Sequence, residues 1–319
     1  MKSELIALML AGFSFPWFAN AQTGDDVINE ALSNRPAEIQ DDSMKLDKKI
    51  CSGSKKYPVH LTFDDGPDPK ITPQVLEVLK KAGIKATFLI STNQLTKGSA
   101  EEIRGRKRLI EKIKQDGHTV GSHSYEHIEH ANLKTHTREQ ILNNIQRSFD
   151  EIDKLNLSKP IPFRFPYGSG WIEDSKDSAN QDMGKEAILK VKAAGYQPFH
   201  WDIDTEDWSK VRRKALPMSA LSQICRSHGG IILMHDVHQW TADNLPTFIE
   251  SIRQSGHTFV SESEIIKYSE QKDGKPLNSL MDRLGRKGGC IYTRGSLEHV
   301  APLCNTSSSS ETKKMNGVQ

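Results

Sequence analysis

The sequence predicts an α/β protein built on a parallel sheet or barrel. From residue 57 to about residue 268, short apolar runs typical of strands alternate with amphipathic stretches typical of helices. Of the 319 residues, 36% are hydrophobic and 26% are charged, which suits a globular protein with a sizeable core. The formal net charge is only +2, which is smaller than the basic excess typical of nucleic-acid-binding proteins and of polybasic membrane anchors.

The apolar runs define the expected strands and the amphipathic stretches define the expected helices. The first helix shows the reasoning, because Val75, Leu76 and Leu79 share one face and Thr72 stands at the expected N-cap position. In chain order the pattern gives a strand at 58–63, a helix at 73–81, a strand at 86–90, a helix at 101–115, a strand at 118–121, a helix at 138–155, a strand at 161–165, a helix at 185–194, a strand at 196–202, a helix at 218–228, a strand at 230–234, a helix at 244–254 and a strand at 257–260.

The first 21 residues are typical of a secretory signal peptide. Lys2 precedes a mostly apolar run over 5–18, and Ala19 and Ala21 are small residues at the two positions that signal peptidase recognises. The run is shorter than the about 20 residues that span a bilayer, and the alternative is an ordinary buried helix. We therefore expect cleavage after Ala21, a secreted or periplasmic location and no stable membrane anchor.

The rest of the chain is expected to divide into three parts. A polar N-terminal extension covers 22–55, the α/β domain covers 56–268, and a partly disordered C-terminal extension rich in Lys, Gly and Ser covers 269–319. An exported protein suits disulfides, and the four cysteines allow three pairings. They are Cys51, Cys225, Cys290 and Cys304. Pairing the last two would leave the first two for each other, but the sequence leaves all three pairings open.

Two adjacent acids follow the first expected strand, in the cluster TFDDGP at 62–67. At a strand end, with Gly-Pro forcing a turn, Asp64 and Asp65 can face one site. One carboxylate could then bind a metal ion while the other stays free as a base. Asp-Asp-Gly turns are also common on solvated surfaces, so this cluster is ambiguous alone.

Two histidines four residues apart form the second cluster. On a helical turn His123 and His127 would lie on one face and present two imidazoles to one ion. Together with Asp65 they make the three-ligand set of a catalytic zinc site. A non-haem iron oxygenase uses similar ligands, but its usual local H-x-D pattern is absent from this histidine cluster. Three further histidines of this region are treated as bystanders: His118, His130 and His136.

Three more clusters stand at later strand ends, and they read RFPYG at 164–168, DTEDW at 204–208 and LMH at 233–235. Arg164 could hold a carboxylate in place, and the Pro-Tyr-Gly turn could aim a backbone N–H at a developing oxyanion. His235 is the candidate proton donor outside the ligand set, and an aspartate beside it would keep it protonated. Taken singly, each cluster could be a structural turn.

The order of these five clusters resembles the polysaccharide deacetylases with a NodB homology domain, carbohydrate esterase family 4, over residues 56–268. The resemblance implies a distorted (β/α) barrel with its site at the C-terminal ends of the strands. It also implies a metal-dependent amidohydrolase, similar to peptidoglycan N-acetylglucosamine deacetylases, that releases acetate from an N-acetylated glycan polymer. The alternatives are a chitin-oligosaccharide or exopolysaccharide deacetylase and an inactive glycan-binding homologue. We expect a monomer.

The resemblance assigns a role to each matched residue. The implied ligands of one divalent ion, normally zinc, are Asp65, His123 and His127. The residues implied in proton transfer and charge stabilisation are the base Asp64, the residue that orients it, Arg164, the acid His235 with its partner Asp207, and the backbone N–H of Tyr167.

Aromatic and apolar residues beside the clusters are expected to contact substrate. The resemblance implies Pro166, Trp208 and Leu233, the last as part of a pocket for the acetyl methyl group. Trp171 lies in a polar insertion, expected at 169–184, where it could stack on a sugar or fill a small core. Trp240 is a second candidate for the groove, and Trp201 is assigned to the core.

Overall fold

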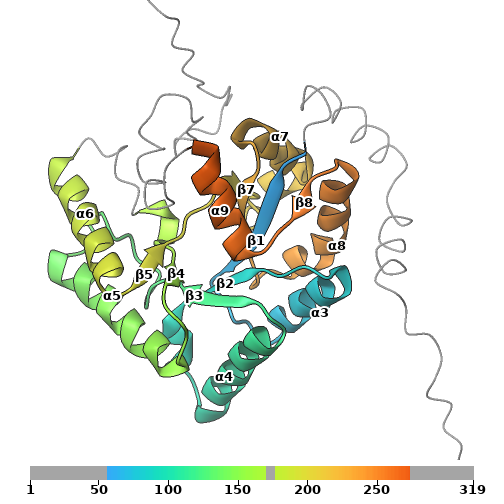
Figure 1. Cartoon of the computed structure of the whole chain (residues 1–319). Coiled ribbons are helices and arrows are strands. Elements are labelled where there is room, and N and C mark those ends of the chain that lie inside the picture. Colours follow the sequence, from blue (N-terminus) through green and yellow to red (C-terminus); the bar gives the residue numbers. More distant parts are fainter. Residues whose placement is uncertain (1–55, 170–176, 274–319) are drawn as a thin grey trace, which may run out of the picture.

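In the computed structural model, which describes residues 56–169 and 177–273, the strands form one curved parallel sheet (Figure 1). The strands are β1 (Pro58–Asp64), β2 (Thr87–Ile90), β3 (Thr119–Ser122), β4 (Ile161–Phe163), β5 (Tyr196–Pro198), β6 (Ile203–Asp204), β7 (Gly230–His235) and β8 (Thr258–Phe259). Their order is β5-β4-β3-β2-β1-β7-β6, and β8 pairs with the start of β1. The sheet curls into a barrel. The barrel is incomplete because no ladder among the described residues joins β5 to β6. The expected distorted barrel is confirmed.

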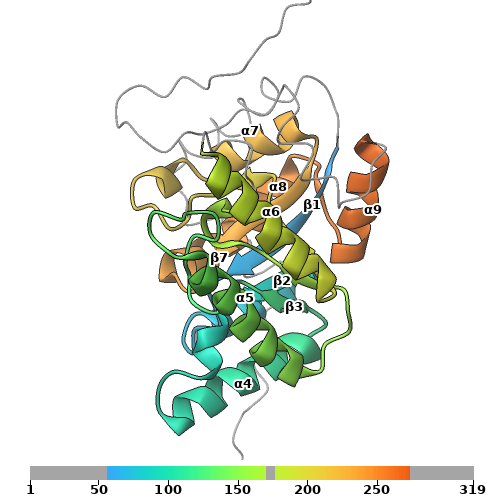
Figure 2. The same cartoon turned by 90° about the vertical axis from the view of Figure 1, so that its left-hand side faces the viewer.

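Helices surround the sheet, as Figures 1 and 2 show. They are α3 (Thr72–Ala82), α4 (Ala100–Gln115), α5 (Arg138–Ile152), α6 (Ser178–Ala193), α7 (Met218–Ser227), α8 (Gln239–Gln254) and α9 (Glu262–Asp273). Short 3₁₀ helices lie between them: η1 (Thr92–Leu95), η2 (Asp153–Leu155), η3 (Pro166–Gly168) and η4 (Arg212–Ala215). The starts of α4 and α5 are fixed by capping boxes, in which Ser99 and Thr137 cap the helices.

The core explains why the apolar runs became strands. β1, β2 and β7 are buried along nearly their whole length, as expected for parallel strands covered on both faces. Phe63 and Phe88 are fully buried and stack with ring centroids 5.1 Å apart. A second cluster lies between α5, α6, β4 and β5, where Phe149 stacks on Tyr196 at 4.3 Å. These contacts fix the strands whose ends carry the polar clusters.

All strands run in parallel, so their carboxyl ends meet at one end of the barrel. In Figure 2 the arrow of β1 points to the left, toward this end, while α9 lies on the right. The opposite end is closed by α9, whose residue Glu262 accepts a hydrogen bond from Thr87 at 3.3 Å. The register of β1 and β7 places Asp64 directly beside His235.

Two expected strand and helix boundaries were wrong. The strand expected at 196–202 is two strands, because the chain leaves β4 after Pro198 and joins β7 at Ile203, crossing the open side of the barrel. The helix expected at 185 begins at Ser178, where Asp177 accepts hydrogen bonds from two backbone amides. The first two turns of this helix carry mostly polar residues and Gly184, so the sequence shows no clear apolar periodicity there. The insertion after the third cluster is correspondingly shorter than expected.

Three further expectations about helices need correction. α8 begins at Gln239 rather than 244 and continues through Pro246, which lies inside it. α9 extends beyond the expected domain boundary at 268. Thr72 is not the N-cap of α3, since Ile71 holds that position. The Thr72 hydroxyl instead donates a hydrogen bond to the Asp236 carboxylate, 2.5 Å away.

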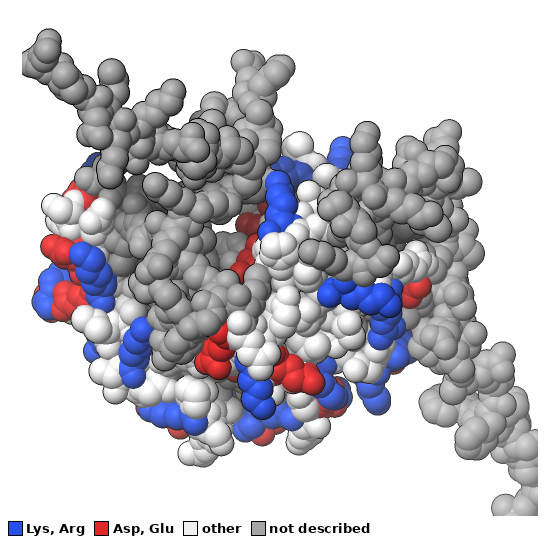
Figure 3. Space-filling view, turned by 45° about the horizontal axis from the view of Figure 1, so that its top comes forward, with Lys and Arg blue, Asp and Glu red and all other residues white. Residues whose placement is uncertain are grey.

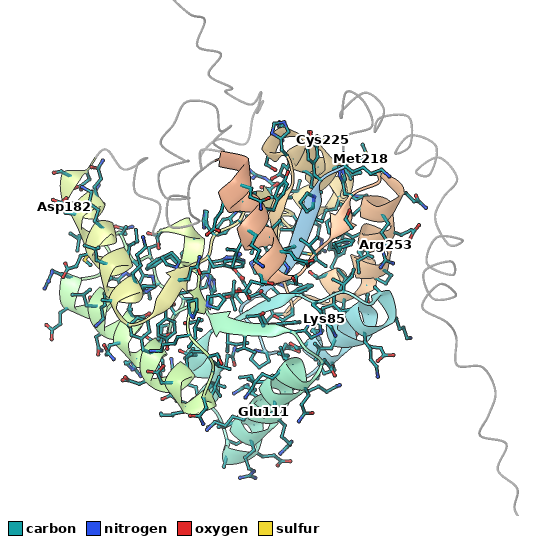
Figure 4. All side chains as sticks on the ribbon, in the orientation of Figure 1. Lys85, Glu111, Asp182, Met218, Cys225 and Arg253 are labelled. Atoms are coloured by element: carbon teal, nitrogen blue, oxygen red, sulfur yellow. The ribbon has the colours of Figure 1, made fainter. Side chains whose placement is uncertain are left out.

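Acidic and basic side chains lie side by side over the face seen in Figure 3, in agreement with the small net charge. Within the described ranges, no helix combines the length and the apolar character needed to cross a membrane. Cys225, labelled on α7 in Figure 4, is disulfide-bonded. The other three cysteines, the expected signal peptide, the extension 22–55, Trp171 and residues 274–319 lie outside the described residues.

Candidate active site

The structure brings all five sequence clusters to the carboxyl ends of the strands. Asp64 ends β1, His123 follows β3, Arg164 follows β4 and His235 ends β7. Asp207 comes three residues after β6. The five clusters, far apart in the sequence, therefore lie together at one end of the sheet, and their roles stay predictions.

A candidate metal centre is formed by Asp65, His123 and His127. One potential ligand atom from each lies within 4.8 Å of the others, and this is the one such group of His, Cys, Asp or Glu among the described residues. The Asp65 Oδ1 atom lies 3.7 Å from His123 Nε2 and 3.6 Å from His127 Nε2. Asp65 reaches this position with a left-handed backbone, at φ 76°.

The two histidines meet through a loop and not through the helical turn that their spacing suggested. Residues 123–127 contain no helix, and Ser124 adopts a left-handed conformation with φ 67°. The Ser124 hydroxyl donates to the carbonyl of Glu126 at 3.0 Å, which closes the turn. The imidazole centroids consequently lie 5.0 Å apart.

His123 is oriented as a metal ligand would be. Its Nδ1 lies 3.0 Å from the backbone carbonyl of Arg164, which leaves Nε2 facing Asp65 with its lone pair. Burial lowers the pKa of His123 to about 3, although Asp65 opposes the shift, so the imidazole is neutral. The buried imidazole of His123, the exposed imidazole of His127 and the carboxylate of Asp65 together fit a divalent ion such as zinc.

The carboxylate of Asp64 is held by a buried guanidinium. Arg164 donates to Asp64 Oδ1 at 2.8 Å, to the Thr62 hydroxyl at 2.7 Å and to the carbonyls of Phe199 and His200 at 2.9 and 3.2 Å. The other oxygen of Asp64 lies 3.7 Å from His123 Nε2 and so faces the metal-ligand group. Burial raises the pKa of Asp64, while Arg164 acts in the opposite direction.

His235 and the buried Asp207 form a hydrogen-bonded pair on the other side of the site. The His235 ring lies 2.7 Å from Asp207 through Nδ1, and its backbone N–H donates to the same carboxylate at 2.8 Å. Thr241 adds a third hydrogen bond to Asp207, at 2.6 Å. Burial alone would lower the pKa of His235, but the charge and hydrogen bond of Asp207, together with the charges of Asp64 and Asp65, outweigh burial and raise the pKa to about 9.

The expected substrate-contact residues differ in exposure. Trp208 is 50% exposed and Tyr167 is 51% exposed, and the Tyr167 ring meets His127 edge-on at 4.4 Å. Pro166 and Leu233 are buried. Tyr167 has a left-handed backbone, at φ 58°, within the expected Pro-Tyr-Gly turn. The roles of these residues stay predictions.

Sequence reasoning missed Asp236, which follows His235 and is fully buried. Burial raises the pKa of Asp236 to about 7. One of its oxygens accepts the Thr72 hydrogen bond, and the other has no hydrogen-bond partner in the described part of the chain. Its carboxyl group packs on Gly66, where an added Cβ would lie 2.3 to 2.4 Å from both oxygens. In the sequence, the residues that could have indicated this contact are the glycine that follows Asp65 and the acid that follows His235.

Comparisons with known proteins agree with this geometry. A family model described as "Polysaccharide deacetylase" matches residues 52–188. The peptidoglycan-N-acetylglucosamine deacetylase PgdA of Listeria monocytogenes serotype 1/2a (strain 10403S) is 28% identical over 238 residues, which cover 72% of this chain and 45% of that protein. The peptidoglycan-N-acetylmuramic acid deacetylase PdaA of Bacillus subtilis (strain 168) is 27% identical over 72% of this chain and 78% of its own length.

A solved structure shares the fold. The catalytic domain of a peptidoglycan N-acetylglucosamine deacetylase from Eubacterium rectale ATCC 33656 matches with a TM-score of 0.51 and 22% identity, over 64% of this chain and 88% of that one. The chain thus spans less than half of its Listeria relative but most of this catalytic domain. Five motifs converge on one site and the family model matches residues 52–188, so the chain resembles the polysaccharide deacetylases over that range.

Proposed function

We propose that this protein is an exported, metal-dependent hydrolase that removes acetyl groups from N-acetylglucosamine residues of peptidoglycan. The observation that carries the proposal is the placement of a ligand set, a separate carboxylate and a protonated histidine around one site. Two relatives named as peptidoglycan deacetylases support the substrate class. The signal-like first 21 residues support export, because peptidoglycan lies outside the cytoplasm.

The metal ion would be held by Asp65, His123 and His127, and we propose zinc. When bound there, such an ion polarises the amide carbonyl and lowers the pKa of water. Asp64 is not one of the three proposed ligands, although one of its oxygens lies next to the ion site. Asp64 is thereby available for proton transfer.

Asp64 is the proposed general base. Its ionised carboxylate accepts a proton from the water that attacks the acetyl carbon. Arg164 contributes in two ways, because its bond to Oδ1 orients the carboxylate and its charge favours the ionised form. The backbone N–H of Tyr167 is the proposed donor to the carbonyl oxygen as negative charge develops on it.

His235 is the proposed general acid. As the carbon–nitrogen bond breaks, the protonated imidazole gives its proton to the nitrogen of the sugar, so that a neutral amine leaves in place of an amide anion. Asp207 keeps His235 protonated up to about pH 9 and occupies Nδ1, which directs Nε2 toward the reaction. The products are acetate and a glucosamine residue.

A binding-only homologue would need neither proton-transfer group. Here Asp64 is buried, His235 is only slightly exposed, and the two are aligned in register at the ends of adjacent strands. This arrangement favours an active enzyme over an inactive glycan-binding protein. The five motifs surround the acetamido group alone, so deacetylation of chitin oligosaccharides or of another exopolysaccharide is an outcome that the experiment must distinguish.

The test is acetate release by the purified protein, with zinc or with a chelator. The substrates are peptidoglycan glycan strands, chitotetraose and an acetylated exopolysaccharide, and Asp64→Asn is the inactive control. We expect acetate from peptidoglycan, none after chelation, and recovery when zinc is restored. Absence of acetate from every substrate in the presence of zinc would overturn the proposal. Export is tested separately by fusing residues 1–21 to a reporter that is active only outside the cytoplasm.

A further inference from the structure

The segment that follows the third candidate carboxylate of the site is strongly basic. Between Trp208 and Pro217 it contains four cations and no acid: Lys210, Arg212, Arg213 and Lys214, here called the basic rim. The net charge of the whole chain is only +2. Trp208 and Val211 of the same segment are 50% and 78% exposed, so the segment also presents apolar surface to solvent.

The four cations differ in their partners. Arg212 forms an ion pair with Glu206, which neutralises it. Arg213 is half-buried and lies with its guanidinium carbon 5.2 Å from the centre of the Trp240 ring. No ion pair to Lys210, Arg213 or Lys214 occurs within the described ranges. Three of the four charges are thus available to a ligand.

Arg213 is the cation whose position is best defined relative to the site. Trp240, on which it packs, lies in the first turn of α8, five residues after His235. Burial is the main cause that lowers the pKa of His238, and the charge of Arg213 adds a smaller effect in the same direction. The His238 ring lies 5.8 Å from the His235 ring. Arg213 is therefore at the edge of the same site as the proposed proton donor.

A half-buried guanidinium without an anion suits a ligand carboxylate. Arginine binds carboxylates through two parallel hydrogen bonds, and the Trp240 ring restricts its orientation and excludes water from one face. A chitin chain is uncharged and offers nothing to such a group. Peptidoglycan strands whose stem peptides have been removed carry a free lactyl carboxylate on every second sugar, and so offer one on the neighbour of each N-acetylglucosamine.

We propose that Arg213, assisted by Lys210 and Lys214, binds a carboxylate on the sugar next to the one that is deacetylated. Arg213 is then a specificity-determining residue that makes the protein prefer an anionic N-acetylated glycan to a neutral one. The inference rests on the proposed function and deepens it, because it names the feature of the polymer that is read. It also predicts that substrate preference depends on ionic strength.

The experiment compares three soluble tetrasaccharides of similar size. The first alternates N-acetylglucosamine and N-acetylmuramic acid, the second is the same molecule with its carboxylates converted to amides, and the third is chitotetraose. Wild type is compared with Arg213→Met, which keeps a long apolar side chain on Trp240. Arg253→Met is the matched control, since Arg253 lies 13 residues beyond Trp240 on α8, about 20 Å away, and is labelled in Figure 4.

For wild type we expect kcat/KM to be about tenfold higher on the carboxylate form than on the amide form, as one charge-assisted contact would give. Arg213→Met should remove this ratio and leave kcat/KM on chitotetraose within twofold. Arg253→Met should keep the ratio. In 0.5 M salt the wild-type preference should shrink, whereas that of Arg213→Met should not change.

Two results would overturn the inference: equal wild-type activity on the carboxylate and amide forms, or an equal loss by Arg213→Met on all three substrates, which indicates a structural role. Calorimetric titration of the carboxylate form keeps the test valid without turnover. If no fragment releases acetate, the proposed function fails, but tighter binding of the carboxylate form by wild type than by Arg213→Met would still support this inference. Equal binding would refute it.

Discussion

Replacing Asp207 with asparagine should move the alkaline limit of activity downward. In the wild-type protein Asp207 binds Nδ1 of His235 and, with smaller effects of Asp64 and Asp65 and against the effect of burial, raises the pKa of that histidine from 6.5 to about 9. Asparagine has nearly the same shape but no charge. Burial is then opposed mainly by the charges of Asp64 and Asp65, and we expect the pKa of His235 to fall to about 6.5.

The size of the effect follows from the protonated fraction of His235. At pH 8, a pKa of about 9 leaves roughly nine tenths of the imidazole protonated, whereas a pKa of about 6.5 leaves roughly 3%. Loss of the proton donor alone should thus lower kcat/KM about 30-fold at pH 8. At pH 6 the wild-type and variant fractions differ by less than about twofold, so most of the loss should disappear unless the imidazole is misplaced.

The assay is acetate release from chitotetraose or peptidoglycan fragments between pH 5 and pH 10, at fixed zinc. Direct titration of His235 by NMR, in protein labelled at histidine, measures the same pKa without turnover. Thr241→Val is a useful control, because it removes one hydrogen bond to Asp207 but keeps the charge. An alkaline limit that stays near pH 9 in Asp207→Asn would refute the assignment of His235 as an acid controlled by Asp207.

Two more predictions separate the parts of the site. His235→Ala should abolish turnover while the purified protein still holds about one metal ion, whereas His127→Ala should lose both turnover and metal. Acetate release measures the turnover and elemental analysis measures the metal. Metal loss in His235→Ala would mean that the roles are wrongly assigned. Gly66→Ala should lower the free energy of unfolding by about 1–3 kcal/mol in urea denaturation and also reduce activity, because its Cβ would overlap the Asp236 carboxyl group beside Asp65. Gly105→Ala, in α4 with no contact nearer than 3.9 Å, should instead stabilise the protein by up to about 1 kcal/mol.

Much of the site could be predicted from sequence because a parallel sheet imposes a simple rule. Every strand that precedes a helix ends on the same side, so polar residues after apolar runs must gather there even when 170 residues separate them. The convergence of Asp64, His123, Arg164 and His235 follows this rule. Predicting this convergence required only the positions of the strand ends, which the apolar runs indicate well.

Features that depend on tertiary partners could not be predicted. The spacing of His123 and His127 suits a helix, but a left-handed Ser124 makes the same approach possible in a loop. Thr72 has the right residue type for an N-cap, yet its hydroxyl donates to Asp236, which lies 164 residues further along the sequence. Neither Asp236 nor the open side of the barrel leaves a periodic signal in the sequence.

The register of β1 and β7 has a consequence for how this architecture can change. Asp64, the proposed proton acceptor, and His235, the proposed proton donor, are neighbours across one ladder, where adjacent strands are about 4.8 Å apart. That separation is set by main-chain hydrogen bonds and not by any connecting segment. Surface segments such as 206–217 can therefore be exchanged between homologues to redirect the protein to other polymers, provided that Asp207 is retained, without realigning the pair that moves the protons.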